Sequence, residues 1–154
     1  MLKPWMMIAI LLAAAGPLSA SEIVDATNPE KIRQLAQGYG SATLTTDGTG
    51  DPMIRGRIDG TSCAIIFYGC SENRDCKNIQ FTSAWQTNGQ YTLEDMNRWN
   101  RTARFGKAYL DGDGDPVLEM NVNLDFGVTE RNLDDTLDWW RVALLQFRGE
   151  VLTK

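Results

Sequence analysis

The chain has 154 residues, 43% of them hydrophobic and 23% charged, a balance that indicates one globular domain and excludes both a disordered chain and a bundle of membrane-spanning helices. Its 15 Lys and Arg and 20 Asp and Glu give a net charge of -5, so nucleic acid is not an expected partner, because that affinity comes from cationic groups. Histidine is absent, which excludes Ser-His-Asp and Cys-His catalytic systems and removes the commonest zinc ligand.

The N-terminal segment, residues 1–20, has the pattern of a secretory signal peptide. Lys3 precedes an uninterrupted apolar stretch, and small residues close the segment. The stretch is shorter than the roughly 20 residues that cross a bilayer, although an uncleaved anchor is the alternative interpretation. We expect cleavage after Ala20 or Ser21, with residues 21–27 forming a short N-terminal segment. The mature protein is expected to be periplasmic or secreted, with no membrane partner after cleavage.

The mature chain is predicted to begin with a helix and a β-hairpin. Asn28 suits an N-cap and Pro29 the first helical position, and Gly38 ends the helix. Residues 47–54, DGTGDPMI, then lie between two runs in which apolar and polar residues alternate. Such alternation around a turn rich in Gly and Asp indicates a hairpin. Residues 111–118, DGDGDPVL, repeat the pattern and predict a second hairpin.

Two more strands are predicted between the hairpins, at residues 63–68 and 79–85, joined by a polar loop that contains two cysteines. Export places cysteines where disulfides persist, so we predict that Cys70 pairs with Cys76. Cys63 lies on an alternating apolar strand and is expected to be a buried thiol, although the sequence leaves open whether it is free. A redox centre of the CxxC type is the alternative, but the spacing differs and no helix start follows Cys70.

One further helix is expected before the second hairpin and another after it. Thr92 and Asp95 fit a capping box at the start of the first of these, which closes at Gly106. The last helix is predicted over residues 130–147, with Thr129 as its N-cap. Its apolar side chains recur every three or four residues and are expected to cover the sheet: Leu133, Leu137, Trp140, Leu144 and Phe147.

These elements predict an α+β fold in the order helix, four strands, helix, two strands, helix. The strands, about six in number, would form an antiparallel sheet in two hairpin-containing halves, on which the three helices pack. The expected domain covers residues 28–149, and residues 150–154 are expected to form a C-terminal tail.

Three runs of the sequence resemble the YbjN family, a bacterial family described as sensory transduction regulators: GYGSATLTTDGTGDPMIRGRIDG, IIFYGC with CKNIQF, and MNRWNRTARFGKAYLDGDGDPVLEMNVNL. The resemblance covers residues 28–147 and departs mainly at Asn121, where the family pattern has Asp. It implies a fold similar to type III secretion chaperones, which bind polypeptide and commonly dimerise. It carries over no catalytic residues.

The candidate partner-binding residues are Trp139, Arg55 and Arg57. Trp139 adjoins Trp140, and only one of them can point squarely into the core, so Trp139 is expected either to rim the core or to anchor a partner. Arg55 and Arg57 project from the polar face of a predicted strand, where they suit an acidic peptide or form ion pairs at a solvated surface.

We therefore expect a protein without catalytic activity, cofactor or metal. It is expected to bind a protein or peptide partner or to have a regulatory role, and two copies of the chain are expected to form a homodimer. The alternative is a hydrolase based on carboxylates, or a protein that binds calcium or another ligand. Asp111, Asp113 and Asp115 alternate as at the start of an EF-hand loop, but Pro116 and Val122 occupy the positions where that loop has Gly and Glu. No spacing identifies the pair of acids that a glycosidase needs.

Overall fold

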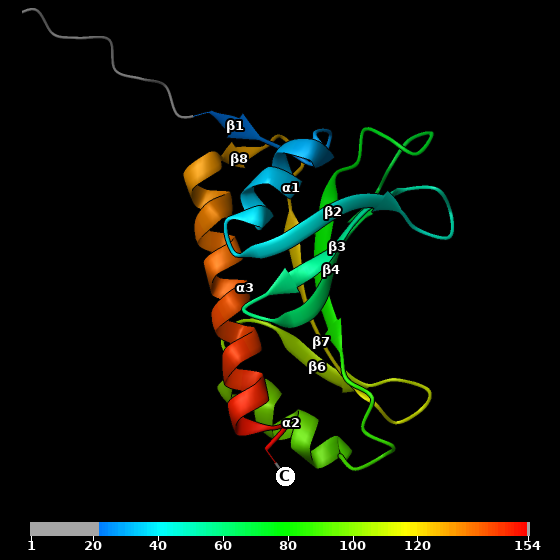
Figure 1. Ribbon diagram of the computed structural model, residues 1–154, viewed down its shortest axis with the longest axis vertical. Helices are drawn as coiled ribbons and strands as arrows, with labels where there is room; N and C mark the ends of the chain where they lie inside the picture. The colour runs from blue at the N-terminus through cyan, green and yellow to red at the C-terminus, as the bar shows by residue number, and fades with distance from the viewer. Residues whose placement is uncertain (1–21, 154) are drawn as a thin grey trace, which may run out of the picture.

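The computed structural model describes residues 22–153, and the signal peptide expected at residues 1–20 lies outside this range (Figure 1). In chain order its elements are β1 (Ile23–Val24), α1 (Pro29–Gln37), β2 (Gly40–Thr46), β3 (Pro52–Ile58), β4 (Thr61–Tyr68), β5 (Asn78–Ala84), α2 (Leu93–Thr102), β6 (Lys107–Leu110), β7 (Pro116–Asn123), β8 (Val128–Thr129) and α3 (Glu130–Glu150). Six strands of the described range form one antiparallel sheet in the order β2-β3-β4-β5-β7-β6. The predicted α+β class, with a six-stranded antiparallel sheet and three helices, is confirmed.

The repeated segment forms the same turn in both hairpins, between β2 and β3 and between β6 and β7. The backbone N–H of Asp47 donates to the carbonyl of Asp51 at 2.9 Å, and the N–H of Asp111 donates to the carbonyl of Asp115 at 2.9 Å. In each turn the carboxylate of the first Asp also accepts the backbone N–H of the last Asp, at 3.0 and 2.9 Å respectively. Asp suits this position because its short side chain can bond to the backbone a few residues further on.

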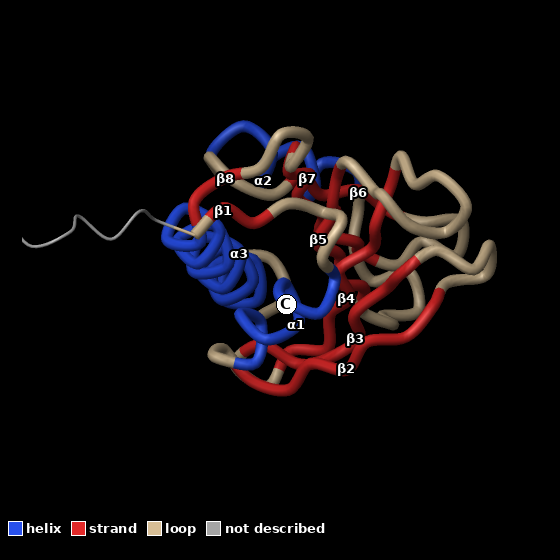
Figure 2. The backbone as a smooth tube through the Cα atoms, turned by 90° about the horizontal axis from the view of Figure 1, so that it is seen from above, coloured by secondary structure: helices blue, strands red, loops and turns tan. Residues whose placement is uncertain are grey.

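Helices α1 and α3 lie on one side of the sheet (Figure 2). The side chains of Asn28, Thr92 and Thr129 each accept a backbone N–H in the first turn of α1, α2 and α3, as their sequence positions predict, which satisfies donors that a helix start leaves unpaired. None of the three helices in the described range has both the length and the apolar character to span a membrane. Helix α3 has 21 residues, and its core-facing side chains are Leu133, Leu137, Trp140, Ala143, Leu144 and Phe147.

Strand β1 lies in the segment 21–27, for which the sequence predicts no secondary structure. It pairs antiparallel with β8, with Ile23 opposite Thr129. Val24 and Ala26 are buried in the same core as the sheet and α3. A strand of two residues has no periodicity that a sequence pattern could detect. The N-terminal segment is therefore part of the packed domain.

The predicted tail at residues 150–154 is corrected by the structure, because α3 continues through Glu150 and Val151 is buried in the core. Val151 follows Phe147 by four residues, so it extends the same apolar side of the helix. Gly149 lies within the helix and does not end it. The sequence-based domain boundary at residue 149 is thus too early.

The three cysteines occupy two different environments. The sulfur atoms of Cys70 and Cys76 are 2.11 Å apart, which is a disulfide bond between the predicted pair. Cys63 of β4 is a free, half-buried thiol. Burial raises the pKa of the Cys63 thiol to about 11, so the thiol stays protonated at neutral pH and is a poor nucleophile.

Candidate partner-binding surfaces

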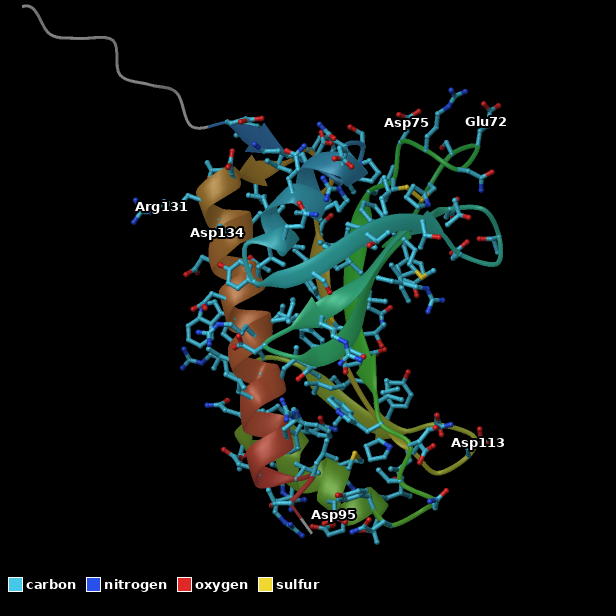
Figure 3. All side chains as sticks on the ribbon, in the orientation of Figure 1. Glu72, Asp75, Asp95, Asp113, Arg131 and Asp134 are labelled. Carbon is cyan, nitrogen blue, oxygen red and sulfur yellow. A yellow bond between two sulfur atoms is a disulfide. The ribbon has the colours of Figure 1, made fainter. Side chains whose placement is uncertain are left out.

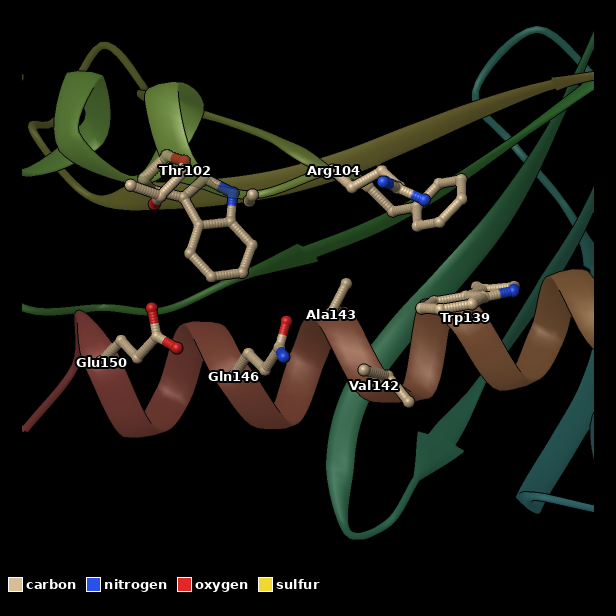
Figure 4. Close-up of a pocket in the computed structure, with 10 residues that line it drawn as sticks. Thr102, Arg104, Trp139, Val142, Ala143, Gln146 and Glu150 are labelled. Atoms are coloured by element: carbon tan, nitrogen blue, oxygen red, sulfur yellow. Dashed lines mark hydrogen bonds between the residues drawn. The ribbon is translucent and has the colours of Figure 1, made fainter.

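A groove of about 310 Å³ lies between the C-terminal end of α2 and the second half of α3 (Figure 4). Trp139 of α3 and Phe105 of the loop after α2 line it, with their ring centroids 4.8 Å apart. Trp139 is 43% exposed and Phe105 is 37% exposed. We call this site the α2–α3 groove. It presents aromatic surface to solvent, a property that is enriched where proteins bind partners.

The orientation of Trp139 follows from the register of α3. Each residue of a helix rotates the side chain by about 100°, so Trp139 and Trp140 cannot both face the sheet. Trp140 is 0% exposed and stacks on Phe81 of β5 with ring centroids 5.6 Å apart. Trp139 is therefore left at the rim of the core. The expected difference between the two tryptophans is confirmed, whereas a role of Trp139 in binding stays a prediction.

The loop after α2 is held by hydrogen bonds that position Phe105. The Trp99 indole N–H donates to the carbonyl of Gly106 at 3.1 Å. The Asn100 side chain accepts the backbone N–H of Ala108 at 2.8 Å and donates to its carbonyl at 2.9 Å. Gly106 has a φ of 77°, a conformation that glycine adopts at no steric cost. Phe105 is absent from the residues predicted from the sequence, where its only signal is an aromatic directly before a glycine at the end of a helix.

The α2–α3 groove also contains two ionic side chains without partners. Within residues 22–153, Arg104 and Glu150 form no hydrogen bond or ion pair through their side chains. Figure 4 shows Glu150 and Gln146 towards one end of the groove, and Arg104 with Trp139 towards the other. The groove thus offers a cation beside its aromatic surface and an anion at some distance along α3.

The sheet edge beside the groove is open over part of β7. Strand β6 pairs only with residues 116–119 of β7, although β7 continues to Asn123. In the described part of the chain, no strand pairs with residues 120–123 on that side. A second hollow, of about 490 Å³, lies along this edge and shares Arg104 and Phe105 with the α2–α3 groove. An unpaired strand edge can accept an added strand through its backbone groups.

Arg55 and Arg57 lie on β3, on the sheet face away from the helices, because they alternate with the buried Ile54 and Ile58. Arg57 donates to the carbonyl of Gly60 at 2.8 Å. The Arg55 side chain forms no hydrogen bond or ion pair with the residues that the structure describes. Trp139 lies on α3, on the opposite side of the sheet, so the structure does not bring the predicted arginine and tryptophan sites together. A binding role for Arg55 and Arg57 stays a prediction.

Glu119 shares the outer sheet face with these arginines but has other partners. Gln80 of β5 donates a hydrogen bond to its carboxylate, and Lys107 of β6 lies 3.4 Å from it. Burial, and then the negative charge of Glu119, raise the pKa of the neighbouring Tyr109. Glu119 is therefore engaged within the sheet and does not form an ion pair with Arg55 or Arg57.

Many acidic side chains are spread over the molecule, whereas Glu22 and Glu130 lie together at Lys31, 3.1 and 2.8 Å from its amino group. Figure 3 shows Glu72 and Asp75 on the loop between β4 and β5 at one end, Asp95 and Asp113 towards the other end, and Asp134 on α3. Within residues 22–153, no three His, Cys, Asp or Glu side chains are placed to hold a metal ion together.

The aspartates of the second hairpin turn bond to the protein itself. Asp111 accepts the backbone N–H of Asp113 at 2.9 Å. Asp115 accepts the backbone N–H of Thr87 at 2.6 Å and its hydroxyl at 3.0 Å. These contacts shape the turn and fasten it to the segment that leads into α2. The alternation of Asp in this segment is explained by turn geometry, and no observation on it favours a calcium site.

Comparisons with known proteins match the chain to a family and to a solved structure. Residues 28–153 match the model of the YbjN family, which carries the description "Putative bacterial sensory transduction regulator". Among curated proteins, no sequence matches this chain. Among solved structures, the chain is similar to one in the crystal structure of the Yersinia pestis type III secretion chaperone SycH in complex with a stable fragment of YscM2. The two are 18% identical, with a TM-score of 0.49 over 82% of this chain and 98% of that chain.

Proposed function

The chain belongs to the YbjN family, and from this premise we propose that it is an exported module that acts by binding a protein or peptide partner and not by catalysis. The observation that carries the proposal is the exposed Trp139–Phe105 pair in the α2–α3 groove, beside the open edge of β7. The family description names a regulator, and binding without turnover is consistent with regulation.

The geometry supports an extended peptide with an apolar and an acidic side chain as the partner. The Trp139–Phe105 surface suits an apolar anchor, because large aromatic residues contribute most to binding where they become buried. Arg104 can donate to a carboxylate on the same segment, since it has no intramolecular partner within residues 22–153. The backbone groups of residues 120–123 can pair with the peptide main chain.

Replacing Trp139 with Ala is expected to weaken peptide binding about tenfold or more, because the aromatic anchor of the α2–α3 groove is lost. Peptides are selected from a random displayed library with the purified protein, and the Kd of the tightest is measured by titration against both forms. Phe126→Ala is the matched control, since Phe126 is an aromatic residue that is 94% exposed outside the groove. If the Trp139→Ala variant and the unchanged protein bind the peptide with equal affinity, the α2–α3 groove is not the peptide-binding site.

Export is proposed from the N-terminal sequence, since residues 1–20 combine Lys3, an apolar stretch and small residues at the end. On expression of the full chain in a bacterium with a periplasm, we expect osmotic shock to release a protein whose mass lacks residues 1–20 or 1–21. Leu11→Arg interrupts the apolar stretch and should leave the precursor mass in the cells. Release of the uncleaved chain, or retention of the unchanged protein, argues against export.

A further inference from the structure

A pocket of about 460 Å³ lies where the turn between β3 and β4 meets the last turns of α3. It shares no residue with the α2–α3 groove. Gln146 and Arg148 are two positions apart, so their side chains leave α3 in directions about 200° apart. The groove and this pocket therefore lie on different sides of the helix. The lining residues that matter here are Arg57, Thr61, Ser62, Trp85, Gln86 and Arg148.

The pocket exists because β4 and β5 separate at this end of the sheet. Their ladder stops at the pair Ala64 and Thr82, although both strands continue beyond it. Across the separated ends the Ser83 hydroxyl donates to the carbonyl of Ser62 at 2.7 Å. Trp85 follows directly after β5 and is half-buried at the pocket wall. The hollow is thus built by the sheet and α3 together.

Both charged side chains of the pocket are cations that bond only to neutral oxygens. Arg57 donates to the carbonyl of Gly60 at 2.8 Å, and Arg148 donates to the hydroxyl of Thr61 at 3.0 Å. A guanidinium has five N–H donors, so most of the donors of both arginines are unused within the described residues. No carboxylate lines the pocket.

The nearest acids along the chain do not line the pocket. Asp59, two residues after Arg57, forms an ion pair with Arg141 at 3.3 Å. Glu150, two residues after Arg148, lines the α2–α3 groove on the other side of α3. The pocket therefore holds two uncompensated positive charges on a chain whose net charge is -5.

We propose that this pocket binds an oxyanion, the carboxylate or phosphate group of a ligand whose body rests against Trp85. Two guanidinium groups are suited to this chemistry, because their planar sets of donors match the spacing of carboxylate and phosphate oxygens. The hydroxyl of Ser62 and the amide of Gln86 add neutral donors at the same wall. The site does not depend on peptide binding in the α2–α3 groove.

The test is an NMR titration of the ¹⁵N-labelled protein with inorganic phosphate in one arm and acetate in the other, with sodium chloride at matched ionic strength as the reference. We expect a saturable shift of the Trp85 indole signal in at least one arm. A response to phosphate indicates a phosphate ligand, and a response to acetate indicates a carboxylate ligand. Arg57→Gln and Arg148→Gln should each weaken that binding about tenfold, because each removes a charged hydrogen bond. The spectrum of each variant also reports whether it is folded.

Arg55→Gln is the matched control, since Arg55 is an exposed arginine of the same strand that lies outside the pocket. It should leave the affinity within about twofold of the original, since it removes a charge but no donor of the pocket. Trp139→Ala should also leave oxyanion binding unchanged, which separates this proposal from the proposed function. The proposal that this pocket binds an oxyanion is refuted if neither anion gives a saturable shift beyond that of chloride. It is also refuted if Arg55→Gln weakens binding as much as the two pocket variants.

Discussion

Replacing Trp140 with Ala is expected to lower the free energy of unfolding by about 3–5 kcal/mol. Trp140 is 0% exposed and stacks on Phe81 at the centre of the sheet, so its removal leaves a cavity that α3 and β5 cannot close. Its indole N–H has no nitrogen or oxygen acceptor within residues 22–153, and the weakly accepting Cys63 sulfur is its polar neighbour. The residue therefore stabilises the fold through packing and not through hydrogen bonding.

Trp139→Ala is the matched control for this substitution, because it makes the same chemical change one residue away. It should lower the free energy of unfolding by about 1 kcal/mol, because it removes only the exposed aromatic contact with Phe105. Urea unfolding of both variants measures the difference. Alkylation of the Cys63 thiol gives a second readout, since only the Trp140 variant should open the core beside it. Similar losses of stability in the two variants would show that the burial pattern of α3 is wrong.

Removing the disulfide is expected to lower the free energy of unfolding by about 2–3 kcal/mol, the loop-closure value for a crosslink over so short a segment. The loop between β4 and β5 also contacts the first hairpin turn, where the Asn73 side-chain amide donates to the Thr49 carbonyl at 3.1 Å and to Asp51 at 2.9 Å. Cys76 is buried in the core, so Cys70→Ala with Cys76→Ala avoids placing a new polar group there.

Urea unfolding of the double variant, and of the unchanged protein with and without dithiothreitol, measures this contribution. The reductant should destabilise the unchanged protein and leave the double variant unaffected, which separates the bridge from the loss of two sulfur atoms. If dithiothreitol shifts neither transition, the bridge contributes nothing to stability. A large shift would mean that the protein is most stable in an oxidising compartment, which agrees with the proposed export.

Features that depend on neighbouring residues could be predicted from the sequence. The three N-caps, Asn28, Thr92 and Thr129, act within one helical turn, so their residue types suffice to place the helix starts. The repeated hairpin turns are likewise formed by hydrogen bonds inside segments of five residues, from Asp47 to Asp51 and from Asp111 to Asp115. The opposite orientations of Trp139 and Trp140 follow from helix geometry alone.

The binding surfaces could not be predicted in this way, because each joins segments that are distant in sequence. Phe105 reaches Trp139 only because α2 and its loop pack beside α3. Arg57 and Arg148 line one pocket only because β4 and β5 separate where α3 ends. The sequence by itself therefore determined the three helices, the six strands of the main sheet, their order along the chain and the side of α3 that is buried, since these depend on local hydrogen bonds and on apolar periodicity. Tertiary packing alone decided which exposed side chains share a surface, since that depends on where whole elements come to rest against each other.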